Sequence, residues 1–217
     1  MNKKGIIVSG GSIDDVFARK FIQDIGPSYI IGVDKGLEFL NRNQIEPTHI
    51  VGDFDSVKAE IIAQYKKNGS IPIHELHPVK DASDTEFALQ LALELGVERL
   101  WILGATGSRL DHVMANIQIL KIAMDAGVKT WLVDSNNQIS LWEKEIRIQK
   151  ENCFGTYFSL FPLGSEVNRV SIVGAKYPLT EYHMTNDESR CVSNELKDEE
   201  VIITFPEGIV VLMETRD

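Results

Sequence analysis

Short apolar runs alternate with helical patterns over the first two-thirds of this 217-residue chain. An amphipathic segment follows each of the first five runs, and the runs lie at residues 5–9, 29–34, 49–53, 71–76, 99–105 and 129–135. Strands that alternate with helices of this length form βαβ units, whose strands pair in parallel. The pattern therefore predicts a mostly parallel, Rossmann-like α/β/α domain over residues 1–136.

Two of the predicted helices carry specific end signals. Ser83 and Glu86 match the S-x-x-E capping box, in which each side chain bonds a backbone N–H at the start of a helix. Gly69 follows an amphipathic segment and reads as a helix stop. Both signals support helices at these places.

The pattern changes near Asn137. Residues 137–150, 155–164, 167–175 and 201–216 alternate apolar and polar positions, with turn residues at close spacing. This is typical of antiparallel strands, so we expect a smaller β-sandwich domain over residues 137–217. Because a domain of about 80 residues buries only a small core, we expect it to pack against the first domain or against another subunit.

The composition narrows the class of protein. With 32 acidic and 22 basic residues the formal charge is −10, whereas proteins that bind nucleic acid usually carry a basic patch. The chain has no run of 18 apolar residues, and the run after its first lysines is too short for a signal peptide. Cys153 and Cys191 lack metal-ligand or C-x-x-C spacing, although a disulfide between them stays open. We expect a cytoplasmic protein that binds neither nucleic acid nor membrane.

The sequence GDFDS, residues 52–56, brings two carboxylates directly after the third apolar run. If the strand continues, Asp53 and Asp55 share one face. Two like charges ~4 Å apart cost about 4 kcal/mol at an effective dielectric constant of ~20, so a cation or a protonated carboxyl must offset them. The alternative is a solvated turn, in which Gly, Asp and Ser are ordinary.

Further polar residues follow the other predicted strands, where open α/β sheets bind their ligands. They are the turn at residues 9–12, Asp34, Asp81, Asp84 and the segment GATGSRLDH at residues 104–112. Carboxylates beside glycine turns that can bind phosphate suggest Mg²⁺ held between the protein and a polyphosphate. Singly, each has a structural explanation: Ser83 and Asp84 as helix caps, Asp34 as a turn residue, and Asp111-His112 as a helix start.

The order of these motifs, VDKG, GDFDS, KDASDTEFAL, GATGSRLDHVMAN and SNE, resembles bacterial thiamine pyrophosphokinase over essentially the full chain. GDFDS and RLDH-x-x-AN are specific in combination. The resemblance implies an ATP:thiamine diphosphotransferase. Such an enzyme transfers the β,γ-diphosphoryl group of ATP to the hydroxyethyl oxygen of thiamine and releases AMP.

The resemblance also implies the site. The catalytic carboxylates would be Asp34, Asp53, Asp55, Asp84 and Asp111, with Mg²⁺ held by Asp53, Asp55 and Asp84. The ATP contacts would be Ser56, Thr85, Arg109, His112 and Asn116. Thiamine would bind at a homodimer interface, with Ser193 and Asn194 of the β domain as its contacts. For these two residues the alternative is a hairpin turn.

The chain departs from the family pattern at two places. Ser108 stands where the family commonly has a second glycine before the arginine, so the phosphate turn differs there. The C-terminal segment PEGIVVLMETRD lacks the tryptophan that stacks on thiamine in eukaryotic members.

Other classes of protein share parts of this pattern. D-F-D-S-V is similar to the nucleophile motif of haloacid-dehalogenase-like phosphatases, but that motif usually ends the first strand and here it ends the third. A nucleotide-cofactor oxidoreductase is disfavoured because GATGSRL lacks the third glycine and comes late in the chain. A non-catalytic nucleotide- or metal-sensing module would carry the same acidic edge, and only turnover separates it from the enzyme.

Overall fold

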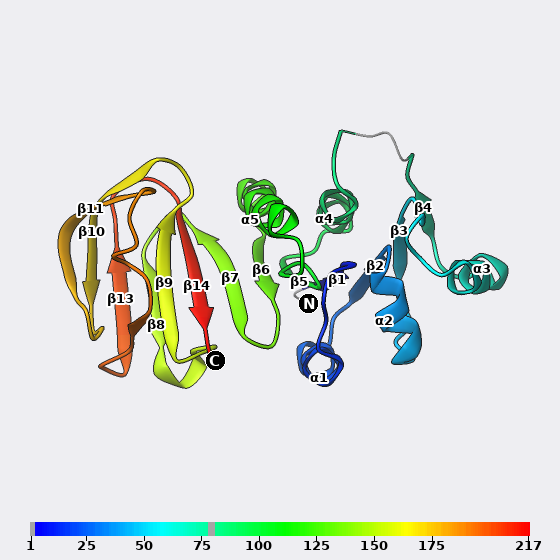
Figure 1. The fold of residues 1–217 in the computed structure, drawn as a ribbon, viewed down its shortest axis with the longest axis horizontal. Coiled ribbons are helices and arrows are strands. Elements are labelled where there is room, and N and C mark those ends of the chain that lie inside the picture. Colours follow the sequence, from blue (N-terminus) through cyan, green and yellow to red (C-terminus); the bar gives the residue numbers. More distant parts are fainter. Residues whose placement is uncertain (1–2, 78–80) are drawn as a thin grey trace. The chain divides into compact units, whose positions relative to one another are not determined.

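The computed structural model describes residues 3–77 and 81–217, and these residues divide into two compact units (Figure 1). The first unit ends at Ser135, and the second is Asn136–Asp217. No helix within the described ranges is long and apolar enough to cross a membrane.

The first unit contains a parallel sheet with the strand order β4-β3-β2-β1-β5-β6. Its strands are β1 (Lys4–Val8), β2 (Tyr29–Val33), β3 (His49–Gly52), β4 (Ile73–Glu75), β5 (Arg99–Leu103) and β6 (Lys129–Val133). Most positions of the central strands are buried, as expected for a parallel sheet that is covered on both faces. The alternation in the sequence therefore predicted the sheet correctly, although β4 is shorter than the expected run at 71–76.

Helices cover both faces of this sheet. They are α1 (Asp15–Ile25), α2 (Gly36–Arg42), α3 (Ala59–Asn68), α4 (Asp84–Glu94) and α5 (Leu110–Asp125). Helices α1 and α2 lie on one face, and α4 and α5 lie on the other (Figure 1). Chain segments that leave neighbouring strands toward opposite faces open a crevice between them, and this arrangement determines where the pocket described below can form.

The helix ends follow the local signals in the sequence. Ser83 caps α4 by accepting a hydrogen bond from the Glu86 backbone N–H at 3.2 Å, and Asp14 caps α1 by accepting from the Phe17 N–H at 2.8 Å. Gly69 ends α3 with a φ of 65°, a left-handed conformation that only glycine adopts without strain. These contacts confirm the predicted start of α4 and end of α3.

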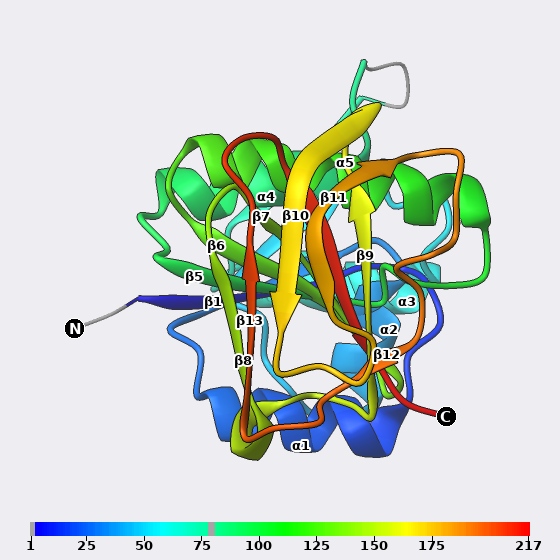
Figure 2. The ribbon, with the colours of Figure 1, turned by 90° about the vertical axis from the view of Figure 1, so that its left-hand side faces the viewer.

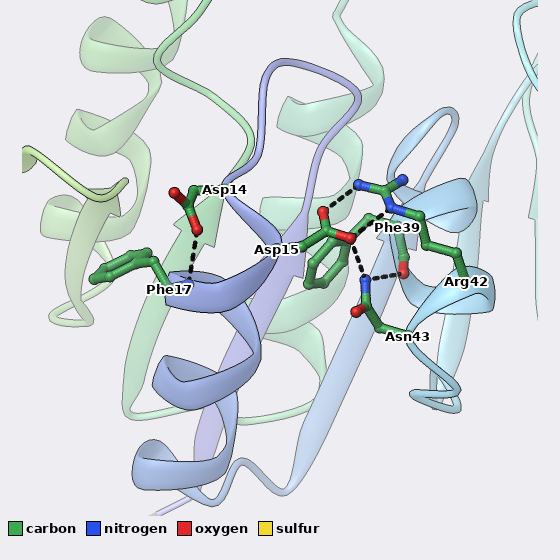
Figure 3. A network of polar contacts seen from close by, with 6 residues as sticks. All are labelled: Asp14, Asp15, Phe17, Phe39, Arg42 and Asn43. Carbon is green, nitrogen blue, oxygen red and sulfur yellow. Dashed lines mark hydrogen bonds and ion pairs between the residues drawn. The ribbon is translucent and has the colours of Figure 1, made fainter.

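A polar network joins α1 to the end of α2 (Figure 3). Arg42 donates from Nε to Asp15 Oδ2 at 2.7 Å, and Asn43 donates to the same oxygen at 2.9 Å. Asn43 also donates to the Phe39 carbonyl at 2.9 Å. The hydrogen bond from Arg42 lowers the pKa of Asp15 from its usual 3.8 to about 2. The charged form of Asp15 is therefore stabilised in the folded chain.

The second unit consists of antiparallel strands. One set is ordered β7-β14-β9-β12 and the other β11-β10-β13-β8, and Figure 2 shows β10, β11 and β13 running alongside one another. The strands are β7 (Asn137–Trp142), β8 (Ile146–Gln149), β9 (Tyr157–Pro162), β10 (Glu166–Val173), β11 (Leu179–Thr185), β12 (Asn194–Glu195), β13 (Glu200–Thr204) and β14 (Val210–Thr215), with a short 3-10 helix at Lys150–Asn152.

One apolar core lies between the two sets of strands. Phe158 and Leu212 reach it from one set and Val170 and Val201 from the other, and all four are at most 2% exposed. Strand β11 was not expected from the sequence, because its residues LTEYHMT are mostly polar and do not alternate regularly with apolar ones. Pairing with β10 makes this segment a strand, and only the tertiary structure supplies that partner.

Candidate active site

A pocket of about 370 Å³ lies where the loops after β1 and β5 separate. Helices α1 and α5, which follow these strands, pack on opposite faces of the sheet, so this is the topological switch point of the parallel order (Figure 1). We call this cavity the switch-point pocket. Its lining includes Ser9, Gly10, Gly11, Asp34, Lys35, Ser56, Ser83, Asp84, Thr85, Gly104, Gly107, Ser108, Arg109, His112 and Asn116.

The pocket gathers most of the residues that the sequence suggested. Those in its lining are Asp34, Ser56, Asp84, Thr85, Arg109, His112 and Asn116. Three other predicted carboxylates, Asp53, Asp55 and Asp111, are not part of the lining. Lys80, the first residue of the KDASDTEFAL motif, lies outside the described residues.

The glycine loops of the pocket touch one another through their backbones. A Cβ atom at Gly11 would lie 2.3 Å from the Gly107 carbonyl oxygen and 2.5 Å from that of Gly104, closer than any side chain allows. The Gly11 N–H donates to the Gly104 carbonyl at 2.9 Å. Glycine is therefore required at position 11 to bring the two loops together and to leave room for a ligand beside their backbone.

Asp34 is the carboxylate whose environment is most perturbed. Burial first, and then the charge of Asp84, raise the pKa of Asp34 from its usual 3.8 to about 7, with a further contribution from Asp53. The Phe54 N–H donates to Asp34 Oδ1 at 3.4 Å, and this hydrogen bond lowers the pKa of Asp34 and so partly offsets the rise. The negative charges of Asp84 and Asp53 thus disfavour ionisation of Asp34 at one edge of the sheet.

The GDFDS segment corrects one prediction from the sequence. Strand β3 ends at Gly52, so Asp53 and Asp55 lie in a turn and not on a shared strand face. The Asp55 N–H donates to Asp53 Oδ1 at 3.2 Å, and Phe54 has a left-handed φ of 62°. The turn reading was the better one for the backbone, because the local side chain-to-backbone bond competes with continued strand pairing.

Arg109 and Asp111 form an ion pair at the start of α5. Arg109 donates from Nε to Asp111 Oδ1 at 3.2 Å, and its Nη2 atom contacts the other carboxylate oxygen. The hydrogen bond from Arg109 lowers the pKa of Asp111 from its usual 3.8 to about 2. Asn116 lies one turn further along α5, is buried, and donates to the Ala105 carbonyl at 2.9 Å, which ties α5 to the loop after β5.

Ser9 is a pocket residue to which the sequence assigned no contact. It directly follows β1, is 3% exposed, and its hydroxyl lies 3.0 Å from the Thr85 hydroxyl in the first turn of α4. The contact joins two segments that are 76 residues apart. A serine directly after a buried strand was the available signal, since such a side chain needs a polar partner.

Ser193 and Asn194 lie in the second unit, at the start of β12. Asn194 is 5% exposed; its side chain accepts from the Tyr177 N–H at 3.0 Å and donates to the Tyr177 carbonyl at 2.8 Å. Ser193 is exposed, has a φ of 57°, and donates its N–H to Ser159 Oγ at 3.0 Å. A second cavity of about 370 Å³ includes Tyr177, Val192 and Asn194 in its lining.

The fold and the pocket define an α/β protein with an acidic, glycine-lined ligand site at the switch point of a parallel sheet. Comparison with known proteins identifies the family within this class. Residues 26–132 match the family model "Thiamin pyrophosphokinase, catalytic domain", and residues 143–210 match "Thiamin pyrophosphokinase, vitamin B1 binding domain". The chain belongs to the thiamine pyrophosphokinase family.

Individual relatives agree with the family models. A thiamine pyrophosphokinase of Bacillus subtilis (strain 168) is 33% identical over 188 residues, which cover 86% of this chain and 87% of the relative. The crystal structure of thiamine pyrophosphokinase from Bacillus subtilis superposes with a TM-score of 0.87 at 31% identity, covering 99% of this chain and 100% of that one. The structure from Geobacillus thermodenitrificans gives 0.84 at 28% identity, covering 99% and 98%.

The activity follows from this membership. The chain is an enzyme of thiamine diphosphate biosynthesis, a transferase that moves the diphosphoryl group of ATP to thiamine. The phosphatase, oxidoreductase and sensor readings of the sequence are set aside, because both halves of the chain match thiamine pyrophosphokinase models.

Proposed function

We propose that ATP binds in the switch-point pocket, which serves as a Rossmann-like nucleotide site. The observation that supports this is the convergence of Asp34, Ser56, Asp84, Thr85, Arg109, His112 and Asn116 on one cavity at the carboxyl ends of the strands. Ser56, Thr85, Arg109, His112 and Asn116 would contact the nucleotide, and the glycine loops would offer backbone N–H groups to phosphate.

Mg²⁺ fits the acidic side of this pocket. Within residues 3–77 and 81–217, no three His, Cys, Asp or Glu side chains converge to hold a metal by themselves. Mg²⁺ is usually bound by one or two carboxylates together with phosphate oxygens, so a complete protein cage is not required. The repulsion that Asp53 and Asp84 exert on the carboxyl group of Asp34 is of the kind that a divalent cation relieves. We propose Asp53, Asp55 and Asp84 as the metal-binding carboxylates, which would share Mg²⁺ with phosphate oxygens and not enclose it by themselves. Bound Mg²⁺ would neutralise charge on the phosphates.

The protein's task in this reaction is mainly positioning and electrostatics. The thiamine hydroxyl oxygen bonds to the β-phosphorus, its proton passes to one of the carboxylates of the site, and the bond from that phosphorus to the AMP oxygen breaks. We propose that Asp34 and Asp111 complete the catalytic carboxylates. Asp111 would act by orienting the guanidinium of Arg109, which it contacts in the structure.

We further propose that thiamine binds to the second unit through Ser193 and Asn194, as part of a homodimer. Both residues lie within the segment that matches the vitamin B1 binding domain. Asn194 lines the second cavity beside the exposed Tyr177, which offers an aromatic surface that the C-terminal segment, without a tryptophan, does not supply. Sedimentation at micromolar concentration tests the dimer, and a monomer there would contradict it.

The cytoplasm is the proposed location. Cys153 and Cys191 are free thiols in the structure, and burial raises the pKa of Cys191 to about 11, so this thiol stays protonated and unreactive at neutral pH. Free thiols are the usual state of cysteines in a reducing compartment.

The experiment that tests the site and its metal is AMP release from ATP, Mg²⁺ and thiamine, with EDTA and thiamine-free controls. We expect AMP that depends on thiamine and disappears with EDTA. Activity that persists in EDTA would remove the metal proposal. Release of ADP or free phosphate in place of AMP would mean a different phosphoryl transfer.

A further inference from the structure

Lys35 is a second cation in the lining of the switch-point pocket, and it is not among the residues proposed to contact the metal, the nucleotide or thiamine. It follows Asp34 in the sequence VDKG and precedes α2. The pocket already holds the carboxyl groups of Asp34 and Asp84, and a polyphosphate ligand adds more negative charge. A second side-chain cation that reaches the ligand would offset this charge together with Arg109 and any metal.

The backbone holds the base of the Lys35 side chain at the edge of the sheet. A Cβ atom at Gly36 would lie 1.9 Å from the Val8 carbonyl oxygen, so the turn packs directly on the end of β1. A Cβ atom at Gly10 would lie 3.2 Å from Lys35 Cβ. Only the outer part of the lysine is free to move, and its base is anchored beside the glycine loop.

The lysine and the arginine of the pocket differ in their partners. Arg109 is paired with Asp111, and a phosphate must compete with that carboxylate for the guanidinium. Among the described residues, Lys35 has no side-chain hydrogen bond or ion pair, although it lines the pocket with Asp34 and Asp84. Its ammonium group can bind an anion without breaking an existing contact.

We propose that the Lys35 ammonium binds a phosphate oxygen of ATP in the switch-point pocket and stabilises the negative charge that shifts during diphosphoryl transfer. This rests on the assignment of ATP to that pocket. No bond to Lys35 forms or breaks: the thiamine oxygen bonds to the β-phosphorus, the hydroxyl proton passes to a carboxylate of the site, and AMP leaves with the electron pair of the broken bond. A lysine acts here as a point charge on phosphate.

The test is calorimetric binding of ATP with Mg²⁺ to the full chain. Lys35→Met should weaken ATP binding roughly 10- to 100-fold, the range for losing a charged hydrogen bond, and Lys35→Arg should recover part of it. Binding of adenosine, which has no phosphate, should not change. Lys58→Met is the matched control, because Lys58 follows the GDFDS turn, is exposed, and does not line the pocket.

The outcomes separate the proposal from its premise. Unchanged ATP affinity in Lys35→Met, an equal loss in Lys58→Met, or an equal loss for adenosine would each overturn the role of Lys35. The premise that ATP binds in the switch-point pocket fails if the unmodified protein does not bind ATP, or if Asp84→Asn leaves its affinity for ATP unchanged. A loss shared by AMP supports a contact with the α-phosphate, and a loss confined to ATP and inorganic diphosphate supports a contact with the transferred group.

Discussion

The carboxylate of Asp34 occupies the space that a side chain at position 52 would need. A Cβ atom on Gly52 would lie 2.1 Å from Asp34 Oδ1, and Gly52 has a φ of 152° that other residues rarely adopt. Glycine at the end of β3 therefore allows Asp34, which directly follows β2, to approach the GDFDS turn. The arrangement of carboxylates depends on this missing side chain.

Gly52→Ala should disturb both stability and activity. The clash and the backbone strain should lower the free energy of unfolding by about 1–3 kcal/mol, and turnover should fall because Asp34 must move. Urea unfolding and steady-state rates measure the two effects. Gly69→Ala is the control. Gly69 also has a positive φ, but a Cβ atom added there would meet no neighbouring atom within 4 Å, so only backbone strain of about 1 kcal/mol is expected. Equal losses in the two variants would mean that the Asp34 contact is unimportant.

Asp34→Asn should change how stability depends on pH in metal-free protein. The pKa of Asp34 is raised to about 7 from 3.8, so the folded chain holds a proton that the unfolded chain releases. Its contribution to stability is present below about pH 4 and is lost as the pH rises through 7. Asparagine stays neutral and tolerates the left-handed φ of 43°.

The melting temperature of the Asp34→Asn variant, relative to the unmodified protein in EDTA, should therefore rise between pH 5 and pH 8. A difference that stays constant over this range would show that the carboxyl is ionised throughout. Activity should be lost at every pH, because the variant lacks the carboxylate.

Asp55→Asn and Asp84→Asn should each reduce turnover at least ~100-fold, the scale of losing one main electrostatic stabiliser, while circular dichroism stays unchanged. Asp125→Asn is the control, since Asp125 pairs with Lys121 at the far end of α5. Near-normal activity of Asp55→Asn would remove the GDFDS turn from the site and leave Asp84 as the metal-binding carboxylate.

Asp15→Asn should weaken the junction between α1 and α2 in a pH-dependent way (Figure 3). Because the pKa of Asp15 is lowered to about 2, its ionised form adds stability that is present above about pH 4 and lost as the pH falls to 2. The pair with Arg42 is partly exposed, so the expected loss at pH 7 is only about 0.5–1 kcal/mol.

Urea unfolding at pH 7 and pH 3 measures this effect, and the difference between Asp15→Asn and the unmodified protein should shrink at pH 3. Asp24→Asn, which removes an exposed pair with Lys20, should cost less at pH 7. A loss that does not change with pH would assign the effect of Asp15 to packing.

Ser193→Ala and Asn194→Ala should fail in different ways. Ser193 is exposed, so its loss should raise the Michaelis constant for thiamine more than that for ATP, without loss of stability. Asn194 is buried and bonded twice to Tyr177, so its loss should destabilise the chain by about 1–3 kcal/mol. Equal effects of Ser193→Ala on the two Michaelis constants would contradict its assignment to thiamine.

Much of the fold could be predicted because local chemistry specifies it. The apolar runs set the parallel strands, and Ser83 and Gly69 set helix ends through bonds within a few residues. The residues after the strands were predicted to meet because carboxyl ends of parallel strands share an edge, and Asp34, Asp84 and Arg109 do line one pocket.

The rest depended on contacts between distant segments. The Ser9–Thr85 hydroxyl pair, the approach of Asp84 to Asp34, and the tight contact of Gly11 with residue 107 join loops that no sequence period relates. Strand β11 forms because β10 supplies backbone partners, and β3 stops at Gly52 because the Asp53 side chain bonds its own turn. The sequence by itself determined which elements form and which edge carries the chemistry, through hydrophobic periodicity and capping. Only the tertiary structure decided which carboxylates lie close to one another and which cation is available to bind phosphate, because both depend on distances across the sheet.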